Sequence, residues 1–136
     1  MRRFVLLATM GALAMTGCAT TARTGRGDAR IDIIAHRGAS AKAPENTLAA
    51  FRLAHDLRAD WFELDCTLTS DGEVVCIHDG TVDRTTNATG EVAKMTLADL
   101  KQLDAGAWKH PDYAGEPLPT LAEALDFARG DIGVYI

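Results

Sequence analysis

The sequence has few of the features that would assign it to several common classes of protein. Its three cysteines show no Cys-x-x-Cys spacing, which disfavours zinc-finger and thioredoxin-like sites. It has no Lys/Arg cluster, and its 14 basic residues are outnumbered by 19 acidic ones, which argues against nucleic acid as the main partner. No internal repeat or low-complexity tract is evident. A phosphate substrate stays possible, because one arginine and a metal ion can neutralise its charge locally.

Long apolar runs are also scarce, and the one that exists lies in the leader. Residues 1–17 begin with a basic pair and continue as an apolar run that is too short to span a bilayer as a mature helix, so they predict an export signal. The segment Met15-Thr16-Gly17-Cys18 resembles a bacterial lipobox, which implies acylation of Cys18. The alternative is an ordinary cleaved signal peptide in which the cysteine is incidental.

The leader and the segment after it predict where the protein resides. Residues 18–30 are rich in Thr, Gly, Ala and charged side chains and lack an apolar period, so we expect a flexible tether. Together they place the body of the chain in the cell envelope, lipid-anchored on the periplasmic face. Ala19 stands where an aspartate often retains such proteins at the inner membrane, which slightly favours the outer membrane of a Gram-negative cell.

The body of the chain, residues 31–136, alternates strand and helix patterns and therefore predicts an α/β domain. The chain stops inside a predicted strand, which would leave an apolar edge exposed, so we expect the first part of a longer domain. The expected strands are 31–35, 61–69, 74–77 and 132–136, and the expected helices start at 47, 96 and 120.

Two carboxylates on the second predicted strand are candidate metal ligands. Glu63 and Asp65 are two residues apart, so their side chains point to the same face, while Phe62 and Leu64 point to the opposite one. Two adjacent carboxylates are costly to bury unless a cation lies between them. Oxygen ligands suit Ca²⁺ or Mg²⁺ better than zinc. The simpler alternative is a solvated strand face.

The turn after this strand predicts which residues share that face. If Asp71-Gly72 is a two-residue hairpin loop, His78 lies opposite Asp65 and joins the carboxylates. A slip of one residue would turn His78 away. The same register places Cys66 and Cys76 on opposite faces and predicts that they form no disulfide.

His36 and Arg37 follow the first predicted strand, where a β/α barrel carries its catalytic groups. With His78 and the metal ligands they form a set suited to phosphodiester cleavage. Arg37 and the metal would bind the phosphate, one histidine would accept a proton, and the other would protonate the leaving oxygen. A single histidine at a strand end is more often structural, and His55 and His110 are interpreted as surface residues for that reason.

An ordered series of motifs resembles the glycerophosphodiester phosphodiesterase family over residues 31–136. The series is Ala35-His36-Arg37-Gly38, Pro44-Glu45-Asn46-Thr47, Glu63-Leu64-Asp65, Asp71-Gly72, Ile77-His78-Asp79, Arg84-Thr85-Thr86 and Leu118-Pro119-Thr120-Leu121.

This resemblance implies a (β/α)₈ TIM barrel of the phospholipase-C-like phosphodiesterase type, of which only the first part is present. It implies Ca²⁺- or Mg²⁺-dependent hydrolysis of glycerophosphodiesters to sn-glycerol 3-phosphate and an alcohol, through attack by the substrate's own hydroxyl and a cyclic phosphate. By position, His36 corresponds to the proton acceptor, His78 to the proton donor and Arg37 to the phosphate ligand. Glu63 and Asp65 correspond to metal ligands, and Glu45 and Asn46 to supporting residues.

Two alternatives stay open at this stage. A related lysophospholipase D or phosphatidylinositol-cleaving enzyme would share these motifs. A truncated envelope lipoprotein without catalytic activity is the other, because the family's third metal carboxylate, in a Glu-x-Lys motif, would follow Ile136. A barrel lacking roughly half its strands cannot close, so we expect the 136-residue chain to be inactive by itself.

Overall fold

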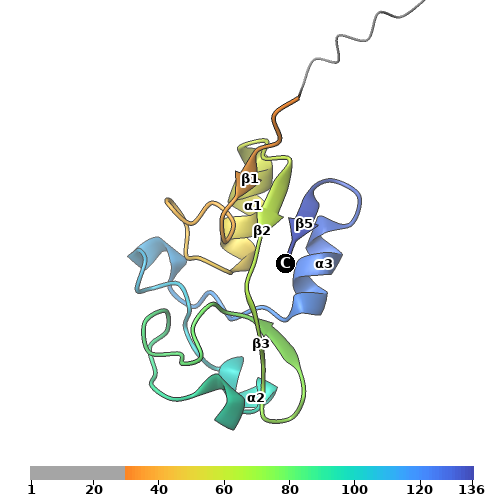
Figure 1. Cartoon of the computed structure of the whole chain (residues 1–136). Coiled ribbons are helices and arrows are strands. Elements are labelled where there is room, and N and C mark those ends of the chain that lie inside the picture. Colours follow the sequence, from red (N-terminus) through yellow and green to blue (C-terminus); the bar gives the residue numbers. More distant parts are fainter. Residues whose placement is uncertain (1–29) are drawn as a thin grey trace, which may run out of the picture.

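The computed structural model describes residues 30–136, so the predicted signal peptide, Cys18 and nearly all of the tether lie outside the described residues. The upper part of the molecule in Figure 1 contains a parallel sheet with strand order β1-β2-β5. The lower part contains an antiparallel hairpin and a short helix. No helix within residues 30–136 is both long and apolar enough to cross a membrane.

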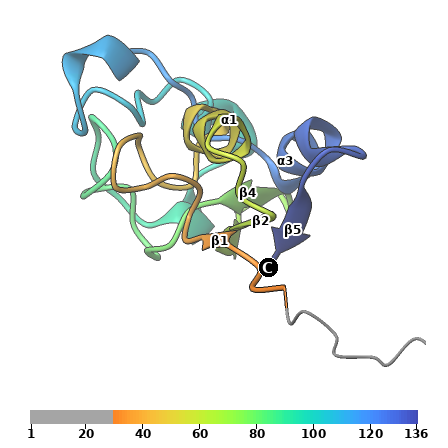
Figure 2. The ribbon, with the colours of Figure 1, turned by 90° about the horizontal axis from the view of Figure 1, so that it is seen from above.

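The sheet and its helices are consecutive β/α units. Strand β1 (Ile34–Ala35) pairs in parallel with β2 (Trp61–Glu63), and β2 pairs in parallel with β5 (Gly133–Tyr135). Helices α1 (Leu48–Asp56) and α3 (Leu121–Ala128) lie on one side of the sheet, as Figure 2 shows from above. This arrangement confirms the predicted α/β class and corresponds to part of a β/α barrel.

The hairpin forms the second part of the fold. Strand β3 (Cys66–Leu68) pairs antiparallel with β4 (Val74–Cys76), and η1 (Val92–Lys94), α2 (Leu97–Leu100) and η2 (Pro111–Tyr113) follow. Residues 61–69 were predicted as one strand. In the structure the run is broken at Leu64–Asp65, where the chain leaves the parallel sheet and enters the hairpin.

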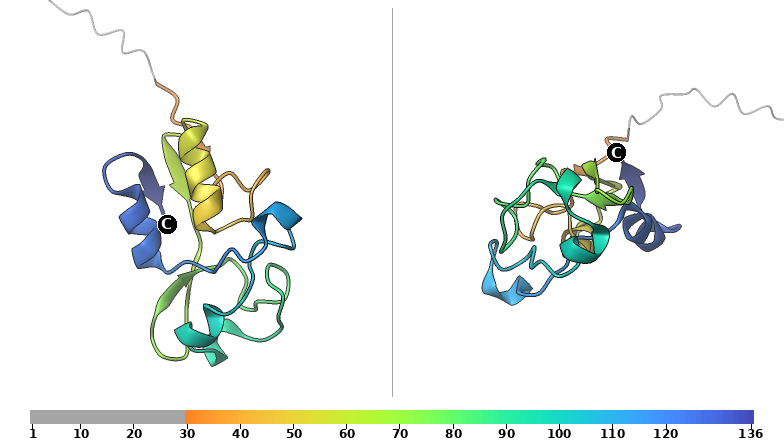
Figure 3. Two further views of the ribbon diagram at one scale, coloured as in Figure 1. Left: turned by 180° about the vertical axis from the view of Figure 1, so that it is seen from behind. Right: turned by 90° about the horizontal axis from the view of Figure 1, so that it is seen from below.

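Two hydrophobic clusters correspond to these two parts. In the first, the rings of Phe51 and Phe62 stack with 4.3 Å between their centroids, and Phe127 packs beside Phe62. Phe62 and Leu64 are both buried, as their strand positions predicted. The second lies between the hairpin and α2 and consists of Val75, Ile77, Val82, Val92, Leu100, Ala105 and Leu118. Helices α1 and α3 contact each other, and Figure 3 shows both of them away from the hairpin.

The register of the hairpin differs by one residue from the predicted one. Thr69 N donates to Glu73 O at 2.9 Å, so the loop contains three residues, and its last residue, Gly72, has a φ of 87°. A three-residue loop that ends in a left-handed glycine is a common hairpin type. Consequently Asp65 lies opposite Ile77, whose N–H donates to Asp65 O, and the prediction of His78 at that position was wrong.

The same shift brings the two cysteines of the hairpin together. Cys66 pairs directly with Cys76, so their side chains share a face of the hairpin. The prediction that they lie on opposite faces was therefore wrong. Both thiols are free in the structure.

Candidate active site

The candidate site lies at the carboxyl ends of β1 and β2. His36 follows the last residue of β1, Glu63 ends β2, and Asp65 comes two residues later. Because neighbouring parallel strands end at the same edge of a sheet, these residues gather there, which is where β/α barrels place their catalytic groups. His36 is exposed to solvent, whereas Glu63 and Asp65 are half-buried.

Arg37 has an unusual backbone that brings it against Glu63. Its φ is 55°, in the left-handed region that residues other than glycine rarely adopt, and its N–H donates to Glu63 Oε2 at 2.8 Å. The next N–H, that of Gly38, donates to the main-chain oxygens of Ala35 and Glu63. Strained backbone of this kind is typical of functional sites, where the surrounding structure holds it in place.

Asn46 fixes the second carboxylate. Its Nδ2 donates to Asp65 Oδ2 at 3.0 Å, and its Oδ1 accepts from Asp65 N at 3.1 Å. The side chain is almost fully buried, and φ at Asn46 is 57°, which asparagine tolerates better than most residues. The two bonds set both the position and the rotation of the Asp65 carboxylate.

One buried nitrogen of the Arg37 guanidinium, Nε, has no hydrogen-bond acceptor among residues 30–136. The guanidinium bonds Glu45 Oε1 through Nη1 at 2.9 Å. Its Nε lies 3.2 Å from Asp65 Oδ2, but the angles are unfavourable for a hydrogen bond, and this buried Nε has no other partner among residues 30–136. The guanidinium therefore lies between the carboxylates of Glu45 and Asp65, and its remaining donors suit an anionic oxygen of a ligand.

Arg84 joins two carboxylates from separate segments. Its Nη1 and Nη2 bond both oxygens of Glu45 at 3.0 and 2.8 Å, and its Nε bonds Asp79 Oδ2 at 2.7 Å. The Arg84 hydrogen bonds are the main reason why the pKa values of Glu45 and Asp79 are held below their ordinary values. The two carboxylates in turn raise the pKa of Arg84.

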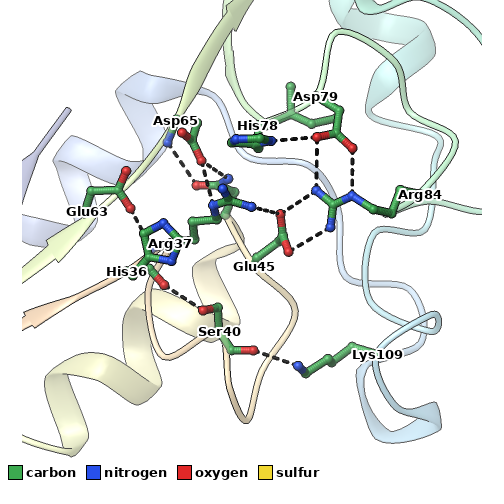
Figure 4. A network of polar contacts seen from close by, with 12 residues as sticks. His36, Arg37, Ser40, Glu45, Glu63, Asp65, His78, Asp79, Arg84 and Lys109 are labelled. Atoms are coloured by element: carbon green, nitrogen blue, oxygen red, sulfur yellow. Dashed lines mark hydrogen bonds and ion pairs between the residues drawn. The ribbon is translucent and has the colours of Figure 1, made fainter.

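Asp79 also orients His78. Its Oδ1 lies 2.6 Å from His78 Nδ1, so the carboxylate accepts a hydrogen bond from that nitrogen. This contact places a proton on Nδ1 and leaves Nε2 free to exchange a proton with a ligand. His78 thereby joins Arg37 through Asp79, Arg84 and Glu45, a network that Figure 4 shows in full.

The loop after β1 is held from the other side. Ser40 Oγ donates to His36 O at 2.7 Å, and Lys109 Nζ donates to Ser40 O at 2.7 Å. Both contacts appear in Figure 4, below the His36 ring. The segment around Lys109 therefore supports the backbone of the loop that carries His36.

The residues present fit a hard divalent cation but supply only part of its ligands. Glu63 and Asp65 offer carboxylate oxygens, the ligand type that Ca²⁺ and Mg²⁺ prefer. One oxygen of each, Glu63 Oε2 and Asp65 Oδ2, is held by the protein, which orients the carboxylates. Within residues 30–136, however, no group of three or more His, Cys, Asp or Glu side chains could by itself hold a metal ion.

The structure thus places the predicted residues in two sets. His36, Arg37, Glu63 and Asp65 gather at one edge of the sheet, and His78 is joined to them through other side chains rather than by lying opposite Asp65. The network-forming roles of Asp79 and Arg84 were not predicted, although both belong to the motifs singled out in the sequence. His55 and His110 are exposed, as predicted.

The fold and site define the class of protein as a β/α-barrel type with a polar site at the carboxyl ends of its strands. The model of the glycerophosphoryl diester phosphodiesterase family matches residues 36–136. A glycerophosphodiester phosphodiesterase of Caldanaerobacter subterraneus is 54% identical over 94 residues, which cover 69% of this chain and 39% of that protein. Human glycerophosphodiester phosphodiesterase 1 is 48% identical over 99 residues, 71% of this chain and 30% of that protein.

Solved structures of similar proteins indicate the same family. A crystal structure of a glycerophosphodiester phosphodiesterase from Agrobacterium tumefaciens is similar with a TM-score of 0.77 and 46% identity, over 79% of this chain and 46% of that one. An Oleispira antarctica phosphodiesterase in complex with the product sn-glycerol-3-phosphate is similar with a TM-score of 0.74 and 46% identity, over 76% and 42% of the two chains. The chain belongs to the glycerophosphoryl diester phosphodiesterase family. It spans less than half the length of the curated relatives it matches.

Proposed function

We propose that the intact protein hydrolyses glycerophosphodiesters to sn-glycerol 3-phosphate and an alcohol with the help of Ca²⁺ or Mg²⁺. The observation that carries this proposal is the polar network that joins Arg37 and the two carboxylates to His78. Membership of the family and the product bound to the Oleispira antarctica relative support the same chemistry.

The side chains divide the reaction among them. Arg37 holds a phosphate oxygen through its guanidinium, and Glu63 and Asp65 would hold the cation. When bound, the cation neutralises charge on the phosphate and polarises it. His36 accepts the proton of the attacking hydroxyl, and His78 donates a proton from Nε2 to the leaving alcohol while Asp79 stabilises its charged ring.

Substitution of the histidines tests this assignment in the full-length protein. His36→Ala and His78→Ala should each lower kcat for glycerophosphocholine by roughly 100-fold or more, since general acid–base catalysis contributes about that much. His55→Ala is the matched control, because His55 is exposed on α1 away from the network, and it should keep full activity. Full activity in either His36 or His78 variant would refute the proposal. Release of lysophosphatidic acid from lysolipids, without cleavage of glycerophosphocholine, would favour a lysophospholipase D.

We also propose that the protein is a lipid-anchored lipoprotein of the cell envelope. The proposal rests on the lipobox-like sequence that ends at Cys18, which lies outside the described residues. Stable anchoring requires more than one acyl chain, as a modified cysteine would provide. Cys18→Ser should move the protein from the detergent phase to the aqueous phase in a detergent partition experiment. An unchanged distribution would contradict the anchor.

A further inference from the structure

Two thiols face each other at the base of the β3–β4 hairpin, in a non-hydrogen-bonded residue pair. Cys66 lies directly opposite Cys76. The positions one step away toward the site are joined by a hydrogen bond from Ile77 N to Asp65 O at 3.0 Å. Hydrogen-bonded and non-hydrogen-bonded pairs alternate along an antiparallel ladder, so Cys66 and Cys76 form a non-hydrogen-bonded pair. In agreement, Cys76 N donates away from β3, to Pro119 O at 2.8 Å.

This kind of pair has the spacing that a disulfide needs. Its Cα atoms lie about 4.5 Å apart, which is within the range of about 4.4–6.8 Å seen for disulfides. Cys76 is fully buried and Cys66 packs against the same hydrophobic cluster, so neither side chain is free to turn away.

We propose that Cys66 and Cys76 are a disulfide site that closes the base of the hairpin when the protein meets a small-molecule disulfide oxidant. The half-buried Cys66 loses its proton, and its Sγ attacks one sulfur of the oxidant, which releases one thiol carrying that proton. Cys76 Sγ then attacks Cys66 Sγ, and its proton leaves with the second thiol. The two cysteine thiols are oxidised, and the oxidant disulfide is reduced to two thiols.

The position of the bridge connects it to the candidate site. Asp65 directly precedes Cys66, and His78 follows Cys76 by two residues. A disulfide at this point would fix the distance between the two strands next to Asp65 and His78. The proposal itself depends only on the hairpin and not on the proposed enzymatic function.

The experiment uses the folded full-length protein with Cys18→Ser, so that the leader cysteine cannot react. Incubation with excess oxidised glutathione should remove the Cys66 and Cys76 thiols together, and peptide mapping should find the two peptides joined. The oxidised protein should melt roughly 5–10 °C higher than the reduced one, because the bridge restricts the unfolded chain. Refolding in the same oxidant should give the same linked peptides and the same melting temperature.

A register control makes the test specific. In Cys66→Ala/Thr67→Cys the new thiol lies opposite Val75 and on the other face of the hairpin from Cys76, so this variant should not form the bridge. The proposal is overturned if glutathione stays attached to Cys66 while Cys76 remains free, or if neither thiol reacts in the folded or the refolding protein. It is also overturned if the control variant forms a bridge as readily as the natural pair.

Discussion

Arg84 lowers the pKa values of two carboxylates in the network, Glu45 and Asp79, and thereby makes the stability of the protein depend on pH. Glu45 and Asp79 both have pKa values below the ordinary range, and hydrogen bonds from Arg84 are the largest cause in each case. The unfolded chain therefore binds more protons than the folded one between the lowered and the ordinary values, near pH 4 and below. In this range the free energy of unfolding should rise with pH. The stability that these two carboxylates contribute should be lost as pH falls.

Arg84→Gln should flatten this dependence. Urea unfolding at pH 3, 4, 5 and 7 should show a smaller proton uptake on unfolding in the variant than in the wild type, because both carboxylates return toward ordinary pKa values. Arg129→Gln is a suitable control, since the one ion pair of Arg129 among residues 30–136 is with the exposed Asp126, and it should reproduce the wild-type slope. Parallel profiles for wild type and Arg84→Gln would show that Arg84 does not set these pKa values.

Gly38 permits the close approach of the site loop to α1. Its φ is 73°, and a Cβ there would lie 2.7 Å from the Ala50 carbonyl carbon. Gly115 also has a positive φ, 83°, but a Cβ there would meet nothing within 4 Å. Comparison of the two therefore separates backbone strain from steric clash.

We expect Gly115→Ala to lower the free energy of unfolding by about 1 kcal/mol, the cost of the left-handed backbone alone. Gly38→Ala should cost roughly 2–4 kcal/mol, because overpacking adds to that strain. Thermal or urea unfolding measures both. Equal losses in the two variants would mean that the loop shifts enough to relieve the contact with Ala50.

Among the secondary-structure elements, the helices α2 and α3 begin where their sequence signals predicted. The Thr96 side chain accepts from Asp99 N and the Thr120 side chain from Glu123 N, each in a capping box. Short-range patterns of this kind are decided by residues three apart, so the sequence contains the whole interaction. The expected starts of these helices were accordingly confirmed.

The capping box of α3 should contribute measurably to stability. Thr120→Ala should lower the free energy of unfolding by about 1 kcal/mol, because the N–H of Glu123 loses its acceptor. Thr89→Ala is the control, since Thr89 is exposed and lies in a loop, and its effect should stay within about 0.5 kcal/mol. Similar small effects in both variants would assign the stability of α3 to packing alone.

The hairpin register could not be predicted in the same way, because it depends on a contact from far along the chain. Asp71, expected inside a two-residue loop, accepts from Leu97 N at the start of α2 and from Thr69 Oγ1. These contacts stabilise the three-residue loop. A change of one residue in loop length shifts every facing pair. The sequence therefore singled out His78 and Asp65 as candidate site residues but did not predict the side chains that join them.

Within the part of the chain that the structure describes, the parallel sheet has an open edge on both sides. Strands β1 and β5 each have one neighbour, and Ile34 and Tyr135 are exposed there. Edges of this kind are available for pairing with further strands. The similar solved chains are longer, and this chain spans 46% of one and 42% of another.

Because the candidate metal site within residues 30–136 supplies two carboxylates, Glu63 and Asp65, this chain should bind Ca²⁺ weakly. Calorimetric titration should give a dissociation constant of roughly 10⁻⁴ M or higher, and the chain by itself should show no metal-dependent turnover of glycerophosphocholine. Glu63→Gln or Asp65→Asn should abolish the binding heat, whereas Glu73→Gln, at an exposed position in the hairpin, should preserve it. Micromolar binding, or turnover by the 136-residue chain, would contradict this assignment.

The placement of the site across two hydrophobic clusters bears on how natural and laboratory variants should be interpreted. Arg37 is carried by the sheet and its helices, whereas Arg84 lies close in sequence to Val82, which is buried in the second cluster. A substitution such as Val82→Ala could thus displace Arg84 from Glu45 without touching any residue that meets a ligand. Screens for lost activity would then return interior positions as well as site positions. A map of such variants would trace the mechanical support of the site rather than its chemistry.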